Sequence, residues 1–201
     1  MELIKENKPS LKKRYKIIPM VLFILGIILT CISMDILYTF KEKEQDILLT
    51  GYLVDEFQSN HIPINFSTVY VIVKHGKSIM HKWFPDNTFG LMDLLAIGYV
   101  ESCYNPDTVG TSGEVGLFQI LRPGESLKRL KLNKEYDFYD IPLNIEMCAE
   151  MLKQKYDSNG KKDYQLTIIA YNGSSTYWPK FIRIKKIVDK ARLRLHKDLT
   201  L

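Results

Sequence analysis

The stretch Leu91–Leu121, LMDLLAIGYVESCYNPDTVGTSGEVGLFQIL, decides the fold. Its first part carries apolar residues at intervals of three and four, which predicts a helix with one buried stripe. These residues are Leu91, Leu94, Leu95, Gly98 and Tyr99. The turn-rich run NPDTVGTSG at 105–113 predicts that the helix ends near Tyr104. Glu101 is therefore expected in the last turn of an apolar helix, facing a loop.

Glu101 is a candidate general acid on physical grounds. A carboxyl group at the end of an apolar helix is half desolvated, and desolvation raises its pKa so that it holds a proton near neutral pH. The alternative is a solvated glutamate at a helix end, and periodicity alone favours that alternative. The residues by themselves permit an acid here without requiring one.

Several motifs, taken together, resemble the signature of the SLT-type lytic transglycosylases. In chain order they are Glu-Ser at 101–102, Asn-Pro at 105–106, Gly113, GLFQI at 116–120 and AYNG at 170–173. That family has a lysozyme-like helical domain and cuts the glycan strands of peptidoglycan. The resemblance covers roughly the last half of the chain. It implies a mainly α fold, with a lysozyme-like transglycosylase domain at residues 65–201.

The resemblance also assigns roles to individual residues. Glu101 would be the catalytic residue, Gln119 and Asn172 would hydrogen-bond the sugar, and the Tyr171 hydroxyl would help to orient the carboxyl group. The complete set of implied substrate-binding residues is Ser102, Gly116, Phe118, Gln119, Tyr171 and Asn172. GLFQI corresponds to the start of a helix in the family. No cofactor is expected. No metal ion is expected either, because the four histidines show no ligand spacing apart from His75 and His81, which are interpreted as surface or core residues.

The chain departs from the family pattern at three positions. Gly110 stands where the family usually has serine, and Glu114 stands where a small residue, commonly alanine, is usual. Phe118 replaces the usual methionine, an apolar exchange that should keep a wall facing the sugar. Glu114 adds a charge near the cleft, which could alter substrate preference.

The expected reaction needs one carboxyl group. Hydrolysis of a glycoside normally uses two carboxylates, and nothing in the sequence marks Asp107, Glu114 or Glu125 as a partner for Glu101. The resemblance implies another route. Glu101 would protonate the oxygen between N-acetylmuramic acid and N-acetylglucosamine, and the muramoyl C6 hydroxyl would attack C1 to leave a 1,6-anhydro end.

The N-terminal part predicts a membrane anchor. Residues 1–16 form a basic arm with six cations, and residues 17–38 form a predicted transmembrane helix that starts with an uncharged run at 17–34. After it, Lys41 and Lys43 alternate with Glu42 and Glu44. The positive-inside rule therefore places the arm in the cytoplasm and the catalytic domain on the periplasmic or wall side of the cytoplasmic membrane.

Other interpretations of the apolar run are open. A cleaved signal peptide lacks a small-x-small cleavage site after this run, and ILTC at 28–31 has threonine where a lipoprotein box has a small residue. A buried core helix does not explain the charge asymmetry. We therefore rank a retained anchor first, with contact to the membrane through Ile17 to Tyr38.

Further elements follow from local patterns. Residues 39–64 are a predicted juxtamembrane helix and linker, and HIPIN at 61–65 ends that helix. Additional helices are predicted at 66–84, from Asp140 with Pro142 in the first turn, from Asp163 to Gly173, and at about 179–196. Residues 121–140 are expected to be mostly loop. Tyr177 and Trp178 could line the sugar site or pack beneath the last helix.

Charge and cysteines add little about function. The formal charge of +5 is concentrated near the two ends of the 201-residue chain, so it does not identify the ligand, and no nucleic acid is expected. Cys103 and Cys148 could form a disulfide outside the cell, a hypothesis based on compartment alone.

Three classes of function remain in competition. The first is a membrane-anchored lytic transglycosylase that acts in a secretion, conjugation or phage assembly. The second is a hydrolytic lysozyme or signal-arrest endolysin, and the third is a non-catalytic module that binds the wall. The sequence does not choose among the assemblies.

Overall fold

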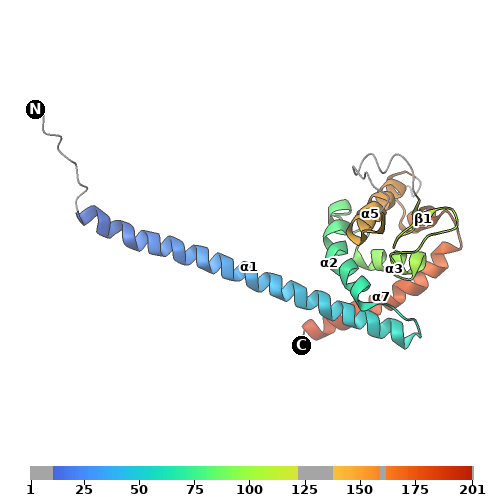
Figure 1. The fold of residues 1–201 in the computed structure, drawn as a ribbon, viewed down its shortest axis with the longest axis horizontal. Helices are drawn as coiled ribbons and strands as arrows, with labels where there is room; N and C mark the ends of the chain where they lie inside the picture. Colours follow the sequence, from blue (N-terminus) through green and yellow to red (C-terminus); the bar gives the residue numbers. More distant parts are fainter. Residues whose placement is uncertain (1–10, 122–137, 159–161, 201) are drawn as a thin grey trace, which may run out of the picture. The chain divides into compact units, whose positions relative to one another are not determined.

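Helices make up most of the protein, which confirms the mainly α prediction (Figure 1). The computed structural model describes residues 11–121, 138–158 and 162–200. The helices are α1 (Leu11–Ser59), α2 (Phe66–Trp83), α3 (Leu91–Ser102), α5 (Ile141–Asp157), α6 (Tyr164–Asn172) and α7 (Tyr177–Leu199). The two strands β1 (Glu114–Val115) and β2 (Ile120–Leu121) form an antiparallel hairpin.

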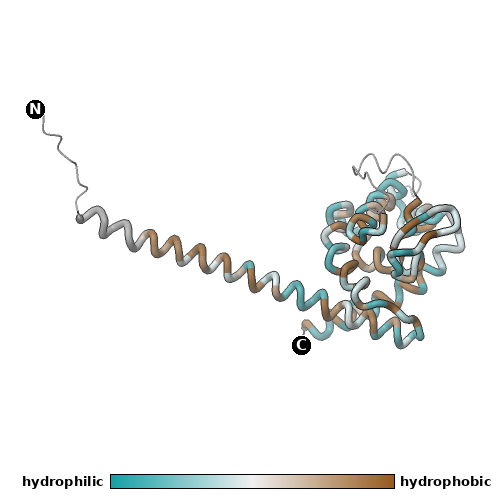
Figure 2. Tube along the Cα trace, in the orientation of Figure 1, coloured by the Kyte–Doolittle hydropathy of each residue, from teal (hydrophilic) through white to brown (hydrophobic). Residues whose placement is uncertain are grey.

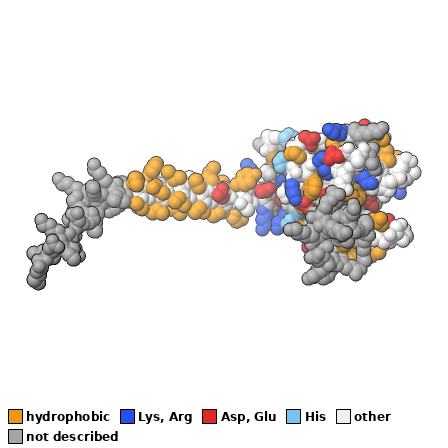
Figure 3. All heavy atoms as spheres, turned by 90° about the horizontal axis from the view of Figure 1, so that it is seen from above, with side chains coloured by type: hydrophobic (Ala, Val, Ile, Leu, Met, Phe, Trp, Pro, Cys, Tyr) orange, Lys and Arg blue, Asp and Glu red, His pale blue; other side chains and the backbone are white. Residues whose placement is uncertain are grey.

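The chain divides into two compact units, Met1–Glu44 and Gln45–Leu201. The first unit contains the apolar part of α1, where side chains from Met20 to Phe40 are exposed (Figures 2 and 3). The helix is long and apolar enough to cross a membrane. Exposed apolar side chains on a helix of this length are what a lipid environment requires.

Helix α1 continues past the predicted end of the membrane span and reaches Ser59. The sequence between Tyr38 and Ser59 contains no proline, and its Lys and Glu residues are good helix formers, so nothing interrupts the helix. The segment Gln45–Ser59 belongs to the second unit rather than to a separate linker. Within that unit Leu53 and Phe57 are fully buried.

Helix α3 lies in the core of the second unit, where it packs against α2 and α7 (Figure 1). It is apolar on nearly every side, and its residues 94–97 are completely buried. Its one early charge, Asp93, accepts a hydrogen bond from the Gly90 N–H at 2.8 Å and another from the Tyr164 hydroxyl at 2.6 Å. Lys185 of α7 lies 3.7 Å from the same carboxylate. The buried charge is thus fully compensated.

The predicted helix boundaries agree with the structure where local capping sets them. Asp140 caps α5 by accepting a hydrogen bond from the Leu143 N–H at 2.9 Å, and Pro142 lies in the first turn. Asp163 caps α6 in the same way, through the Leu166 N–H at 2.8 Å. Gly173 ends α6 in a left-handed conformation with φ +82°. Helix α7 is longer than predicted at both ends.

The segment GLFQI was predicted to start a helix, and this prediction is wrong. Residues 116–119 form the tight turn between β1 and β2. Gly116 (φ +79°) and Gln119 (φ +48°) both have left-handed backbones, which a helix cannot contain. A Cβ at Gly116 would lie 2.5 Å from the Phe138 carbonyl oxygen and 2.7 Å from Asn144 Nδ2, so glycine is required there. Most of the predicted loop, residues 122–137, lies outside the described residues.

Candidate active site

The end of α3 brings Glu101 to the surface of the core. The helix ends at Ser102, two residues before the predicted end, because Cys103 adopts a left-handed backbone with φ +54°. The Ser102 hydroxyl is buried and donates to the Leu117 carbonyl oxygen at 2.7 Å. This hydrogen bond ties the last turn of α3 to the turn of the hairpin.

Glu101 lies in a pocket of about 400 Å³. Helices α3, α5 and α6 and the β1–β2 hairpin contribute to it. Its lining residues are Glu101, Gly110, Thr111, Glu114, Gln119, Leu121, Met151, Tyr171 and Asn172. Four residues that the sequence assigned to one site are therefore brought together from segments far apart in the chain: Glu101, Gln119, Tyr171 and Asn172.

The surroundings of Glu101 favour its protonated form. Its pKa is raised from 4.5 to about 7, chiefly because burial desolvates the carboxyl group and to a smaller extent because of the charge of Glu114. The Tyr177 hydroxyl, the Asn172 amide and the Lys180 ammonium act in the opposite direction. Among the described residues, the buried oxygen Oε1 of Glu101 has no hydrogen-bond partner. The side chain is thus able to hold a proton near neutral pH and to present it to a ligand.

The backbone of the hairpin turn fixes Gln119. Its Nε2 donates to the Thr108 carbonyl oxygen at 3.0 Å and to the Gly116 carbonyl oxygen at 2.9 Å. Its other amide atom, Oε1, lies beside Gly110, where an added Cβ would be only 2.8 Å away. The carbonyl oxygen is therefore the part of Gln119 that faces the pocket, as an acceptor for an N–H or O–H group.

The tyrosine beside Glu101 differs from the expectation. The hydroxyl of Tyr171 donates to the Phe118 carbonyl oxygen at 3.0 Å, so it supports the hairpin rather than orienting the carboxyl group. The residue that faces Glu101 is Tyr177, whose buried hydroxyl has no well-aligned hydrogen bond to a described residue. The contact between Tyr177 and Glu101 is therefore electrostatic, because its geometry falls short of a formed hydrogen bond.

Three of the predicted substrate-binding residues have no side chain in the pocket. Phe118 is completely buried, and its ring fills the space next to Gly98, so the predicted wall facing the sugar is absent. Ser102 is buried as described above, and Gly116 shapes the turn. These three residues shape the site without lining it: Ser102 and Phe118 pack in the core under the hairpin, and Gly116 allows its turn.

The comparison with known families agrees with this arrangement. The family model described as the transglycosylase SLT domain matches residues 83–192, more than half of the chain. The chain belongs to the SLT family. No curated protein and no solved structure shows significant similarity to it.

Membership of the SLT family confirms the lysozyme-like fold class and supports lytic transglycosylase activity on peptidoglycan. The match to the SLT domain starts at Trp83, whereas the compact unit starts at Gln45. Helix α2 and the end of α1 therefore extend the SLT domain. Asp46 of α1 forms an ion pair with Lys77 of α2 at 3.1 Å, so the two added segments are also joined to each other.

Two departures from the usual SLT pattern are physically linked. A Cβ at Gly110 would collide with Glu114 Oε2 and lie 3.2 Å from Glu114 Cβ. Glu114 is held in this place because its Oε2 accepts a hydrogen bond from the Ser112 N–H at 3.0 Å. A serine at position 110 would therefore displace the Glu114 carboxylate from the place that it has here. The loss of one side chain makes room for the other.

Sequence reasoning missed a residue that shapes the SLT site, Asn144 of α5. It is buried, its Oδ1 accepts from the Phe118 N–H at 2.8 Å, and its Nδ2 donates to the Phe138 carbonyl oxygen at 2.9 Å. The available signal was a polar residue beside Ile145 and four residues before Cys148 on the predicted buried stripe. A buried amide in a core position needs partners, and here the partners are backbone groups around the turn.

The remaining aromatic and cysteine hypotheses are resolved by packing. Trp178 lies in the first turn of α7 and stacks on Phe181 of the same helix, with ring centroids 5.8 Å apart, so it packs against the core. Cys103 is exposed and Cys148 is buried, and both are free thiols, so the hypothetical disulfide is absent. Burial raises the pKa of the Cys148 thiol, which leaves it inert.

Proposed function

We propose that this protein is a membrane-anchored lytic transglycosylase in which Glu101 is the single general acid and base. The proposed cut is between N-acetylmuramic acid and N-acetylglucosamine, and the proposed product carries a 1,6-anhydro end. One observation carries the proposal: the side chain of Glu101 lines a pocket together with the amides of Gln119 and Asn172, and its buried Oε1 has no hydrogen-bond partner among the described residues.

In the first step Glu101 gives its proton to the glycosidic oxygen. The bond from that oxygen to muramoyl C1 breaks, and the N-acetylglucosamine portion leaves as an alcohol. The resulting carboxylate is stabilised by the groups that lower the pKa of Glu101, which are Tyr177, Asn172 and Lys180. A residue with a pKa of about 7 is suited to both giving and taking a proton at neutral pH.

In the second step the Glu101 carboxylate takes the proton of the muramoyl C6 hydroxyl. The C6 oxygen attacks C1 and closes the anhydro ring, and Glu101 regains the proton it had given. No water is consumed and no second carboxylate is required. Binding of the sugar N-acetyl groups is proposed for Asn172 and for the carbonyl oxygen of Gln119, since amides recognise amides by paired donors and acceptors.

Membrane attachment through α1 is part of the proposal. Its support is the long apolar exposed helix and the excess of cations before it. The N-terminal arm would lie in the cytoplasm and the catalytic unit on the outer side, where the wall polymer is found.

The decisive experiment is digestion of purified sacculi followed by mass spectrometry. We expect products lighter by one water than the reducing-end products of a hydrolase. Glu101→Gln should lower the rate by about 100- to 10 000-fold, the range for loss of a general acid. Asp107→Asn, an exposed carboxylate six positions along the chain, is the matched control and should leave the rate unchanged. Absence of any product would reject the enzyme in favour of a binding module.

A hydrolytic lysozyme is the second candidate, because Glu114 lines the same pocket as Glu101. In that mechanism Glu114 would act on a water molecule or on C1 itself, and reducing ends would form. Glu114→Gln would then abolish activity together with Glu101→Gln. Under the transglycosylase proposal Glu114→Gln remains active, so the two variants and the product ends separate the candidates.

A further inference from the structure

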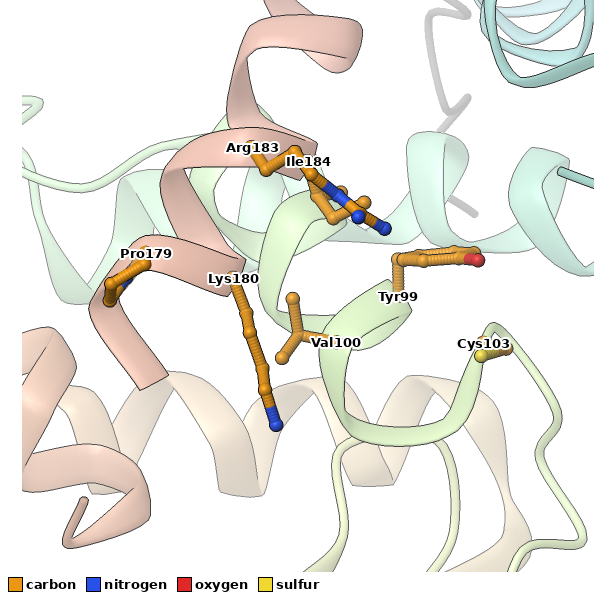
Figure 4. A pocket seen from close by; sticks show the side chains of 7 residues that line it. All are labelled: Tyr99, Val100, Cys103, Pro179, Lys180, Arg183 and Ile184. Carbon is orange, nitrogen blue, oxygen red and sulfur yellow. The ribbon is translucent and has the colours of Figure 1, made fainter. Parts of the chain in front are cut away.

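A second hollow, separate from the Glu101 pocket, lies between α3 and α7 (Figure 4). Its volume is about 430 Å³. In Figure 4 the side chains of Lys180 and Arg183 extend from α7 beside Val100 and Tyr99 of α3. None of the described residues that line it is acidic. The hollow therefore combines apolar walls with positive charge.

A neighbouring hollow of about 380 Å³ shares Arg183 and adds Lys186 and Lys190. It also lacks an acidic residue among its described lining residues. We call the four cations Lys180, Arg183, Lys186 and Lys190, with the two hollows they line, the basic track. All four side chains are exposed, and none forms an ion pair with a described residue.

Other cations of the same helix behave differently. Lys185 contacts Asp189 at 2.7 Å, Arg192 lies 3.9 Å from Asp189, and Arg194 lies 3.3 Å from Glu56. Helix α7 thus pairs the cations that lie away from the two hollows and leaves the four cations along them unpaired among the described residues. This is the charge pattern of an anion-binding surface.

The basic track begins beside the catalytic pocket. Val100, which lines the first hollow, directly precedes Glu101, and the charge of Lys180 acts on the Glu101 carboxyl group. From Lys180 to Lys190 the helix rises about 15 Å. A ligand that fills the track is therefore elongated, and its end at Lys180 is the end nearest to Glu101.

We propose that the basic track binds the peptide stem that the muramoyl sugar carries, with the stem carboxylates on Arg183, Lys186 and Lys190. This inference rests on the proposed function, because it names the part of the same substrate that lies outside the sugar pocket. A stem of roughly four to five residues spans about 13–18 Å when extended, which matches the track. Val100 and Ile184 supply apolar contact for the methyl groups of its alanines.

The test compares two forms of one substrate. Glycan strands are used with their stems intact and after removal of the stems by an amidase, and kcat/KM is measured on each for the full-length protein in detergent. Arg183→Gln with Lys186→Gln should lower the ratio of the two kcat/KM values about tenfold, since charge-assisted contacts to the stem are lost. Arg192→Gln is the matched control, an exposed cation on another face of the same helix, and it should keep the ratio.

A binding measurement separates this inference from the proposed function. Titration of a soluble muramoyl-peptide into the Glu101→Gln protein needs no turnover, and the two track substitutions in that background should weaken binding about tenfold. If stem binding is lost with the track while no anhydro product forms on any strand, the inference holds and the proposed function fails.

Two results overturn the inference. The first is that the track substitutions change neither the ratio of the two kcat/KM values nor the affinity for the muramoyl-peptide. The second is that the substitutions reduce binding to anionic phospholipid vesicles while stem binding persists, which would make the track a membrane contact. The substituted side chains are exposed, so the variants are expected to fold, and an unchanged unfolding temperature checks this.

Discussion

At the scale of single residues, Glu101 is placed where a carboxyl group is costly. Its pKa in the folded protein is about 7, against 4.5 for an exposed glutamate, so the folded state binds more protons between these values. The contribution of Glu101 to the free energy of unfolding is therefore most favourable below pH 4.5. It falls as the pH rises from 4.5 to about 7, and it stays low at higher pH. The difference is on the order of 3 kcal/mol.

Replacing Glu101 by glutamine should remove that cost. We expect Glu101→Gln to be more stable than the parent protein above pH 7, with a gain on the order of 3 kcal/mol, and to show little difference near pH 4. Thermal unfolding followed by tryptophan fluorescence from pH 4 to pH 8.5 measures it. A difference that does not vary with pH would contradict the assigned pKa.

The pairing of Gly110 with Glu114 gives a second prediction. Gly110→Ser alone should destabilise the fold by about 1 kcal/mol, because the new side chain displaces the Glu114 carboxylate from the Ser112 N–H. The double variant Gly110→Ser, Glu114→Ala should recover most of the loss. Denaturant unfolding of the four proteins in a double-mutant cycle measures the coupling. Additive effects would show that the two positions are independent.

How far the sequence predicts such residues depends on the range of their contacts. The helix end that carries Glu101 was predicted because the apolar helix and the turn after it are adjacent in the chain, whereas the catalytic role of Glu101 was predicted from the resemblance to the SLT family. Tyr177 faces Glu101 from another helix, and no local pattern distinguishes it from Tyr171 as the neighbour of the carboxyl group. The roles of the two tyrosines follow only from how α6 and α7 pack.

At the scale of elements, the β1–β2 hairpin depends on α5. Asn144 accepts from the Phe118 N–H and donates to the Phe138 carbonyl oxygen, so one side chain holds the turn from below. The same turn carries Gln119 into the pocket. The side-chain amide of Asn144, on a helix distant in sequence, thus sets the position of Gln119 in the pocket.

Asn144→Ala is expected to cost about 2–4 kcal/mol, because two buried backbone groups lose their partner. The rate on sacculi should also fall at temperatures where the variant is still folded, since Gln119 loses its support. Gln165→Ala is the control, because this amide is exposed on α6 and its loss should cost less than about 1 kcal/mol. Equal effects of the two substitutions would reject this role for Asn144.

The contrast between caps and hairpin explains which elements the sequence predicts. Asp140, Asp163 and Gly173 act on backbone groups within four residues, so their chemistry is readable locally. The turn at 116–119 depends on Asn144 and on left-handed backbones at Gly116 and Gln119. A motif of apolar residues after a glycine fits a helix start equally well until the partner helix is known.

At the scale of the whole molecule, the proposed topology can be tested with the native cysteines. Cys103 is exposed in the catalytic unit, Cys148 is buried, and Cys31 lies in the apolar part of α1. A membrane-impermeant maleimide should label Cys103 in right-side-out membrane vesicles, and the Cys103→Ser protein should take up no label. Labelling confined to inverted vesicles would reverse the orientation.

The catalytic unit joins the two ends of its own chain. The Tyr52 hydroxyl of α1 donates to Asp198 of α7 across 146 positions, and Arg194 bonds to Glu56. These contacts join segments that are about 140 positions apart, so the Gln45–Leu201 unit closes this junction only once α7 is available. If the proposed topology holds, a chain exported with α1 first therefore carries an unfilled seam until α7 has followed it across the membrane.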